Sequence, residues 1–227
     1  MIENLRLHYA PDNASLCVRL ALTEMGLPFE TILVDRRARG QKAPEYLRLN
    51  PNGLIPTLET PDGPIYETAA ILLWLADRRG DLFPAEGAKE RGDALKWLFW
   101  LSNTLHPAER MLFYPDQYIA AEFQDALSLR TRARIAALFA LLDAENPDFL
   151  SGPASILQCY LAPLLRWPRL YGGGGNWLNL SDYPSLSHFA KTFETRPSVL
   201  RAAAAEGLGP TPFSDPILPD PPEGSAL

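Results

Sequence analysis

The segment NPNGLIPTL at residues 50–58, followed by YETAAI at residues 66–71, decides the fold and the candidate site of this chain. The first four residues predict a turn, and the remainder predicts a short apolar strand that contains Pro56. Proline lacks the N–H that a paired strand needs, so it is rare inside one. A cis bond between Ile55 and Pro56 is one explanation, because it would turn the N–H and C=O of Ile55 toward a ligand. An edge-strand proline is the structural alternative.

The second segment places Glu67 and Thr68 at the start of an apolar stretch that predicts a helix. The first N–H groups of a helix have no partner within it, and together with the helix dipole they can bind a carboxylate. The alternative is an ordinary helix cap. Taken together, the two segments predict a site for an extended, peptide-like ligand with a free carboxylate.

The composition limits the class of protein. The 227 residues suit one large domain or two small ones, and the 47% apolar content is sufficient for a core. A net charge of −6 argues against a nucleic-acid surface, and we interpret the basic residues at 36–39 as a solvated loop. No apolar run is long enough to span a bilayer, and the first residues lack the pattern of a signal peptide.

The two cysteines, Cys17 and Cys159, lie far apart and form neither a metal motif nor a CxxC motif. No metal is expected. Cysteines are often buried, and both are predicted to lie in the core. A reducing, cytoplasmic location fits this cysteine usage.

The order of predicted elements changes near residues 79–90. Before that point the pattern predicts strands at 5–9, 29–34, 55–59 and 65–66, and helices at 15–25, 44–49 and 68–78. After it the pattern predicts helices at 86–105, 122–145, 155–165, 183–196 and 198–205, with a flexible glycine run at 172–175. Ser155 and Gln158 have the spacing of a capping box. We therefore expect domains at residues 1–80 and 88–213, and an extended, Pro-rich tail at 214–227.

This arrangement resembles the cytosolic glutathione transferase family over roughly residues 5–205. The matching stretches are residues 50–58, residues 67–71, FLSG at 149–152 with SILQ at 155–158, YPSL at 183–186 and RP at 196–197. YAP at 9–11, SL at 15–16 and TLH at 104–106 most resemble the bacterial Beta class.

The resemblance implies an α/β thioredoxin-like N-terminal domain and an all-α C-terminal helical domain. It implies a detoxification enzyme that joins the glutathione thiolate to small hydrophobic electrophiles, acts as a homodimer, and has no nucleic-acid or membrane partner. A glutathione-dependent peroxidase or lyase of the same fold, or a non-catalytic glutathione-binding or regulatory protein, is the alternative.

The resemblance also assigns roles in glutathione binding. The backbone of Ile55, before a cis Pro56, would pair with the cysteinyl part of glutathione. Glu67 and Thr68 would bind the ammonium and carboxylate of its γ-glutamyl part. Asn52 would contact the glycyl end or simply form the turn. Arg39, Gln41 and Lys42 are further candidates for the glycyl carboxylate.

The loop that should activate the thiol departs from the Beta-class pattern, because the position of the Beta-class cysteine falls on Ala14. Asp12 would repel a thiolate. A hydroxyl or amide donor near the sulfur favours the thiolate, which is the nucleophile. We rank Ser15 first, Asn13 second and Tyr9 third; a plain helix cap is the alternative role of Ser15.

The second-substrate pocket is expected where the long helix ends at His106, since the Beta class has a histidine there. The other candidates on the same side are Asn103, Arg110, Phe113 and Tyr114. Packing between domains is the alternative for the two aromatic residues.

Overall fold

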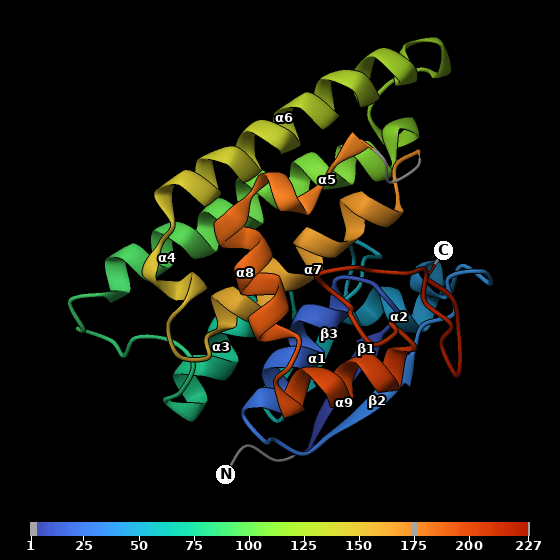
Figure 1. Ribbon diagram of the computed structural model, residues 1–227. Coiled ribbons are helices and arrows are strands. Elements are labelled where there is room, and N and C mark those ends of the chain that lie inside the picture. The colour runs from blue at the N-terminus through green and yellow to red at the C-terminus, as the bar shows by residue number, and fades with distance from the viewer. Residues whose placement is uncertain (1–3, 174–176, 227) are drawn as a thin grey trace.

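The computed structural model describes residues 4–173 and 177–226, and its first part is a four-stranded sheet flanked by helices (Figure 1). The strands are β1 (Leu5–Tyr9), β2 (Phe29–Leu33), β3 (Thr57–Thr60) and β4 (Gly63–Tyr66). They lie in the order β2-β1-β3-β4, with β1 parallel to β2, and with β3 antiparallel to both β1 and β4. This mixed sheet confirms the predicted thioredoxin-like fold.

Three helices accompany the sheet: α1 (Ser15–Glu24), α2 (Pro44–Leu49) and α3 (Thr68–Arg79). Successive side chains of a strand point to opposite faces. Tyr9 therefore lies on the α1 side, where Arg19 is 4.6 Å from its ring centroid. His8 lies on the opposite side, where its ring contacts Tyr46 of α2 at 5.7 Å between centroids.

The rest of the chain is helical. It comprises α4 (Arg91–Trp100), the π-helical turn η2 (Leu101–Leu105), α5 (His106–Phe113), α6 (Gln124–Glu145), α7 (Ile156–Leu170), α8 (Pro184–Phe193) and α9 (Pro197–Glu206). Short 3-10 turns lie at η1 (Gly40–Lys42), η3 (Pro115–Gln117), η4 (Ala121–Phe123), η5 (Asp148–Leu150) and η7 (Leu180–Asp182).

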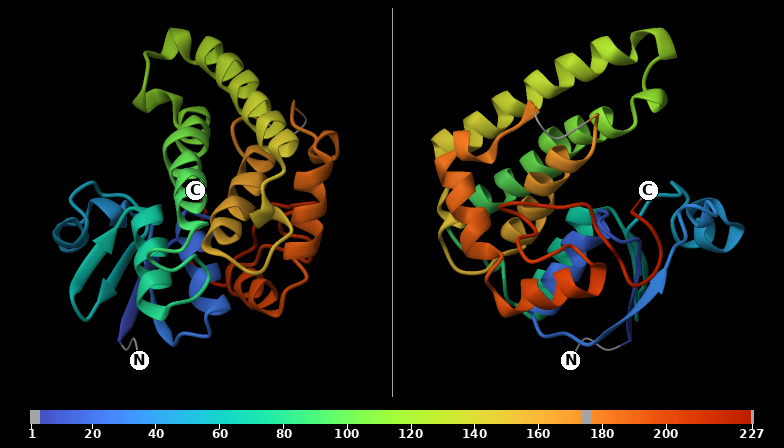
Figure 2. Two further views of the ribbon diagram at one scale, coloured as in Figure 1. Left: turned by 90° about the vertical axis from the view of Figure 1, so that its left-hand side faces the viewer. Right: turned by 45° about the vertical axis from the view of Figure 1, so that its right-hand side comes forward.

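Helix α7 is the centre of this second part. Every residue from Ile156 to Pro168 is buried. One side of α7 packs on α1, and the other elements in contact with it include α5 and α8 (Figures 1 and 2). A helix that is apolar nearly all round belongs in a core, so α7 joins the sheet unit to the helical bundle.

Several predicted helix boundaries are wrong. The helix expected at residues 86–105 begins at Arg91, and it does not end at His106 but continues through η2 into α5. Pro107 cannot donate a hydrogen bond, and the wider π turn before it accommodates that loss. Helix α7 continues to Leu170, beyond the expected residue 165. The expected glycine run at 172–175 lies partly outside the described residues.

The C-terminal segment forms no helix or strand within residues 214–226, as expected for an extended tail, but it is not a free tail. Phe213 is completely buried. The Glu194 carboxylate accepts hydrogen bonds from the N–H groups of Phe213 and Ser214 at 3.1 and 2.9 Å. The segment is therefore fixed against α8.

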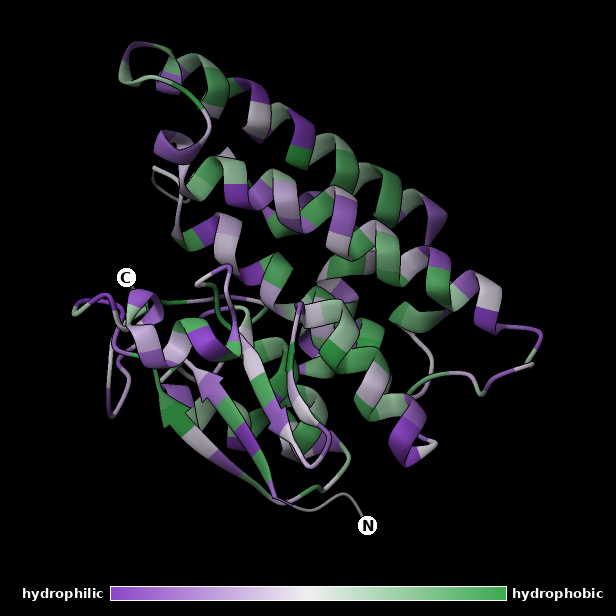
Figure 3. Cartoon of the chain, turned by 180° about the vertical axis from the view of Figure 1, so that it is seen from behind, coloured by the Kyte–Doolittle hydropathy of each residue, from purple (hydrophilic) through white to green (hydrophobic). Residues whose placement is uncertain are grey.

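In residues 4–173 and 177–226, no helix is long and apolar enough to cross a membrane. Figure 3 shows hydrophilic residues interspersed along the helices.

The capping box at the start of α7 is only half formed. Ser155 Oγ accepts from the N–H of Gln158 at 3.3 Å, as predicted. The Gln158 amide does not reach back to Ser155, because its Nε2 donates to the carbonyls of Phe149 and Gly152 at 2.7 and 3.2 Å. Gln158 thus ties the preceding loop to the helix.

Ser155→Ala should lower the free energy of unfolding by about 1 kcal/mol, because one N–H at the buried start of α7 loses its acceptor. Urea unfolding followed by circular dichroism measures the change. Ser151→Ala is the matched control, since Ser151 is exposed. Equal stabilities of the two variants would contradict a capping role for Ser155.

Candidate functional site

The loop before β3 has unpaired backbone groups. The Ile55–Pro56 peptide bond is cis. Among the described residues, neither the N–H nor the C=O of Ile55 has a hydrogen-bond partner. Ile55 is half-buried and Pro56 is buried, so this backbone is held in place while its polar groups stay available. An extended ligand can pair with them as an added strand would.

The start of α3 supplies a second set of available groups. Glu67 has a φ of 73° and a ψ of 114°, a conformation that favours glycine and costs a non-glycine residue about 1–3 kcal/mol. Its side chain is exposed and has no partner among the described residues. Thr68 is buried, and the N–H groups of the first turn of α3 have no acceptors within the helix. A carboxylate fits these N–H groups, and an ammonium fits Glu67.

The turn at residues 50–53 is built by its own polar side chains. Asn50 Nδ2 and Tyr46 Oη donate to the carbonyl of Leu54 at 2.8 and 2.6 Å. Asn52 is exposed, and Lys42 Nζ lies 3.4 Å from its carbonyl oxygen. Asn52 therefore forms the turn, and Lys42 brings a positive charge to it.

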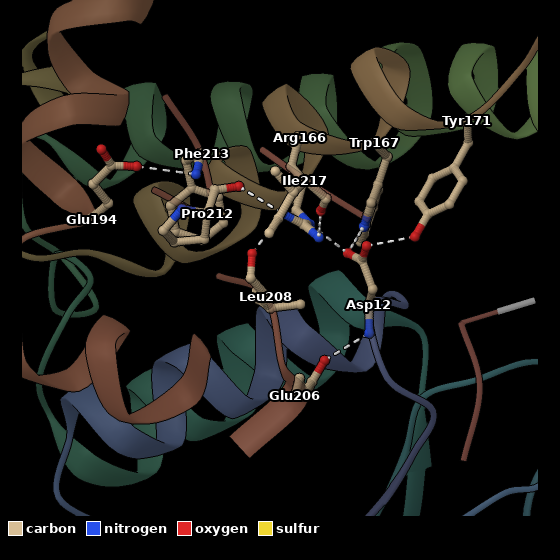
Figure 4. A network of polar contacts seen from close by, with 10 residues as sticks. All are labelled: Asp12, Arg166, Trp167, Tyr171, Glu194, Glu206, Leu208, Pro212, Phe213 and Ile217. Atoms are coloured by element: carbon tan, nitrogen blue, oxygen red, sulfur yellow. Dashed lines mark hydrogen bonds and ion pairs between the residues drawn. The ribbon is translucent and has the colours of Figure 1, made fainter. Parts of the chain in front are cut away.

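The loop between β1 and α1 is fixed by a buried carboxylate (Figure 4). Asp12 Oδ1 accepts from Arg166 Nε and Trp167 Nε1, both at 2.8 Å, and Asp12 Oδ2 accepts from Tyr171 Oη at 2.6 Å. The side chains of Asp12 and Arg166 are completely buried. The backbone of Asp12 has a φ of 49°, and its N–H donates to Glu206 at 2.8 Å. Asp12 therefore sets the shape of the loop.

Glu206 extends this network to α9. Its carboxylate accepts from Arg19 Nε at 2.6 Å and is itself completely buried. Burial raises the pKa of Glu206 to about 7, and the Arg19 charge opposes that shift. The loop is thus joined to α1 and α9 as well as to α7.

The candidates for thiol activation differ in availability. Ser15 Oγ donates to the carbonyl of Ala10 at 3.1 Å, accepts from the Ala10 N–H, and is completely buried, so its hydroxyl closes the loop. Tyr9 Oη donates to Glu223 of the C-terminal segment. Asn13 uses its Oδ1 to accept from the N–H of Ala14 at 2.9 Å. Its Nδ2 has no acceptor among the described residues, which leaves Asn13 as the best available donor of the three.

The candidates for the second substrate fall into two groups. His106 Nδ1 lies 3.0 Å from Tyr160 Oη, and its ring contacts Trp167. Burial, with a smaller effect of Arg110, lowers the pKa of His106 to about 4, so the ring is neutral at pH 7. Burial raises the pKa of Tyr160, and the nearby charge of Glu67 adds to this. His106 and Tyr160 therefore form one polar contact beside Trp167.

The second group lies beyond His106 at the end of α5. Phe113 packs edge-on against Tyr171, with ring centroids 6.1 Å apart. Tyr114 Oη accepts from Arg36 Nη2 at 2.9 Å, while Arg110 lies over the Tyr114 ring. These contacts bring Phe113 and Tyr114 close to the Asp12 loop. Asn103 is exposed in η2, where it accepts from Ser102, and no contact joins it to either group.

Both cysteines are buried, as predicted. Cys17 Sγ lies 3.9 Å from the carbonyl oxygen of Tyr160, and burial raises its pKa well above the usual value. A neutral, buried thiol is a poor nucleophile.

The sequence patterns missed the residues that hold the Asp12 loop: Arg166, Trp167, Tyr171 and Glu206. One signal was present. Arg166 interrupts an apolar run in α7, and a charged residue at such a position requires a buried partner. The partner itself lies 154 residues away, so it could not be identified from spacing.

Comparison with known proteins identifies the family. Residues 14–78 match the family model of the glutathione S-transferase N-terminal domain. The chain is 30% identical over 217 residues to glutathione S-transferase GST-4.5 of Xanthomonas campestris, covering 90% of this chain and 100% of that relative. It is 28% identical to the disulfide-bond oxidoreductase YfcG of Escherichia coli, covering 89% of this chain and 96% of that relative.

Comparison with solved structures identifies the same family. A bacterial beta class glutathione S-transferase of Sphingomonas chungbukensis is 31% identical, with a TM-score of 0.75 over 89% of this chain and 98% of that one. A sphingomonad glutathione S-transferase complexed with glutathione is 32% identical, with a TM-score of 0.73 over 90% and 100% of the two chains. This chain belongs to the glutathione S-transferase family.

Arg166→Met should lower the free energy of unfolding by about 3–5 kcal/mol, because it leaves the buried Asp12 carboxylate without its cation. The double variant Asp12→Asn/Arg166→Met should lose less than the sum of the single losses. Arg78→Met, which breaks the exposed pair with Asp62, is the control and should cost less than about 1 kcal/mol. Chemical denaturation measures the parent, Asp12→Asn, Arg166→Met, the double variant and Arg78→Met, and equal losses at Arg166 and Arg78 would refute the buried-pair assignment.

His106 should make the fold sensitive to acid. Its pKa of about 4 lies below the value of an unfolded histidine, so between about pH 6.5 and pH 4 the unfolded chain binds a proton that the folded chain does not. The free energy of unfolding therefore falls as the pH falls through this window, by on the order of 1–2 kcal/mol from this residue.

The variant His106→Gln should lose less stability than the parent protein between pH 7 and pH 4.5, as measured by urea unfolding at each pH. The exposed His188 provides the control, and His188→Gln should behave as the parent does. If His106→Gln follows the parent, the assignment of a neutral, half-buried His106 is wrong.

Proposed function

We propose that this protein is a glutathione transferase that joins the thiolate of glutathione to small, hydrophobic electrophiles. One observation carries the proposal: the free backbone groups of Ile55 and the free groups at the start of α3 are both present in the sheet unit. A protein that kept only the fold would not need to keep these groups available. The sphingomonad relative in complex with glutathione supports the same ligand here.

Each part of glutathione has a matching group. The backbone of Ile55, held by Pro56, pairs with the cysteinyl residue. Glu67 binds the ammonium of the γ-glutamyl part, and Thr68 with the first N–H groups of α3 binds its carboxylate. The glycyl carboxylate lies toward Asn52, where Lys42 supplies the charge.

The chemical step needs the thiolate. The thiol proton leaves to solvent, and Asn13 Nδ2 donates to the sulfur, which favours the charged form. The sulfur then forms a bond to the electrophilic carbon, and the leaving group departs with its electron pair. In an addition to a conjugated double bond, the proton instead goes to the neighbouring carbon.

The electrophile binds against the second part of the chain. His106 is neutral, so with Tyr160 it offers an uncharged polar edge, while Phe113 and Tyr114 offer apolar faces. Arg110 and Asn103 lie at the border of this pocket.

We propose in addition the division into domains at residues 1–80 and 88–213, a homodimer, a cytoplasmic location and a role in detoxification.

One observation favours a second candidate function. The Asp12 loop carries Ala14 where the Beta class has cysteine, and the hydroxyl of Ser15 is occupied. A protein that binds glutathione without conjugating it, or that uses it as a peroxidase, a lyase or, as in YfcG, a disulfide oxidoreductase, would also fit such a loop.

The test begins with calorimetric titration of glutathione into the protein, in which Glu67→Gln should weaken binding about tenfold through loss of the ammonium partner. Conjugation to chlorodinitrobenzene then measures the transferase activity. Asn13→Ala should lower kcat about tenfold or more and raise the pKa seen in the pH profile of kcat/KM, because the thiolate loses a donor. Ser15→Ala tests the first choice made from the sequence.

The outcomes separate the candidates. Absence of glutathione binding would contradict both candidate functions. Glutathione binding without conjugation would favour the second candidate function. An unchanged rate in Asn13→Ala would remove that residue from catalysis.

A further inference from the structure

The last described residues of the chain lie on the loop that begins α1. The Glu223 carboxylate accepts from Tyr9 Oη, and the carbonyl of Ala226 accepts from Arg36 Nη1. A Cβ added to Gly224 would lie 2.5 Å from Leu33 Cδ1 and 3.3 Å from Pro11 Cδ, so the backbone here touches both side chains. Figures 1 and 2 show the C-terminal end beside the segment that follows β2. We call residues 223–226 the terminal clasp.

The clasp lies on the side of the site assigned to the electrophile. Arg36 contacts the clasp through Nη1 and Tyr114 through Nη2, at 2.9 Å for the latter. Pro11 precedes Asp12, whose carboxylate is bonded to Tyr171, and Tyr171 packs on Phe113. The clasp therefore touches the residue before Asp12 directly and is joined to Tyr114, at the end of α5, through Arg36.

Arg36 has no acidic side chain as a partner within the described part of the chain. Its side chain is not free in solvent, as the sequence suggested, but half-buried between the clasp and Tyr114. Its hydrogen-bond acceptors are a carbonyl and a hydroxyl, and no salt bridge to an acidic side chain is found for it among the described residues. A guanidinium in such a place favours an anionic ligand, and its two parallel N–H groups match a carboxylate.

The clasp can leave without unfolding the protein. The preceding chain is fixed by Arg166, which donates to the carbonyls of Leu208, Pro212 and Ile217 at 3.4, 3.0 and 2.8 Å. Beyond Ile217 the tail has few contacts before the clasp, among them the hydrogen bond from the N–H of Asp220 to Gly207 at 2.9 Å. The Arg166 anchor does not involve the clasp, so the clasp can exchange for a ligand while the preceding tail stays in place, and the ligand takes over the groups of Tyr9 and Arg36 that the clasp contacts.

We propose that Tyr9 and Arg36 form a carboxylate-binding subsite in the electrophile pocket, which the terminal clasp occupies when no electrophile is bound. Electrophiles that carry a carboxylate bind by taking the place of Glu223 on Tyr9 Oη and of the Ala226 carbonyl on Arg36. The Glu223 carboxylate shows that the position accepts this group. This inference rests on the proposed transferase function and names the substrate class of the same site.

The test compares two electrophiles that differ in one charge: para-chloro-dinitrobenzoate and its methyl ester. In both, the glutathione thiolate displaces chloride. Arg36→Gln should lower kcat/KM for the carboxylate about tenfold and change kcat/KM for the ester less than about twofold. Arg37→Gln is the matched control, because this neighbouring arginine is exposed and has no partner among the described residues. In Arg37→Gln, the ratio of kcat/KM for the carboxylate to kcat/KM for the ester should equal the ratio in the parent protein.

Removing the competing carboxylate should have the opposite effect. Glu223→Gln should raise kcat/KM for the carboxylate by about threefold, since the clasp then holds Tyr9 less strongly. Asp215→Asn removes another tail carboxylate, whose nearest cation is Arg169 at 4.0 Å, and should change nothing. Equal effects of Arg36→Gln on both electrophiles, or an unchanged rate in Glu223→Gln, would overturn the subsite.

A third measurement is independent of glutathione. Hydrogen exchange at the amides of residues 223–226 should speed up at least about threefold when nitrobenzoate is added to the parent protein, because displaced amides exchange faster, and should not respond to methyl nitrobenzoate. Loss of glutathione binding would refute the proposed function alone, whereas unchanged exchange with nitrobenzoate would refute the subsite alone.

Discussion

The buried contact between Asp12 and Arg166 is the constraint on which the rest of the structure depends. Two charges without access to water are tolerated only when their hydrogen-bonding capacity is filled. Here Trp167 and Tyr171 complete the coordination of Asp12, while three carbonyls of the C-terminal segment complete that of Arg166. Because these hydrogen bonds hold the Arg166 side chain in place, α7, the loop after β1 and the tail are fixed as one unit.

This constraint also decides which side chains of the Asp12 loop can contact a ligand. The Asp12 carboxylate is buried and paired with Arg166, so its charge is neutralised and does not oppose a thiolate. Ser15 bonds Ala10 and closes the same loop. The donor left on the open side is the amide of Asn13, and the tail that Arg166 anchors ends on Tyr9. The same interaction that shapes the loop thus brings the terminal clasp to the proposed electrophile pocket.

Local patterns predicted the elements whose causes are local. The alternation of Leu5, Leu7 and Tyr9 predicted β1, and Ser155 predicted the start of α7 within one residue. The helix through His106 was predicted to stop too early, because the pattern at Pro107 indicates a break and a π turn leaves no signature in composition. The basic cluster at residues 36–39 was interpreted as solvated, yet Arg36 is half-buried, because its neighbours Tyr114 and Ala226 are remote in sequence.

The sequence by itself determined the family and the change from mixed strands and helices to helices alone, and it located the segments that we propose to bind glutathione, because turns, helix starts and a proline before a strand are encoded within a few residues. Only the tertiary structure decided which side chains of the Asp12 loop remain available. That choice depends on Arg166, Glu206 and Glu223, which lie 154, 194 and 214 residues from their partners in the loop and in β1. Hydrogen bonds over such separations follow from packing, and no local pattern records them.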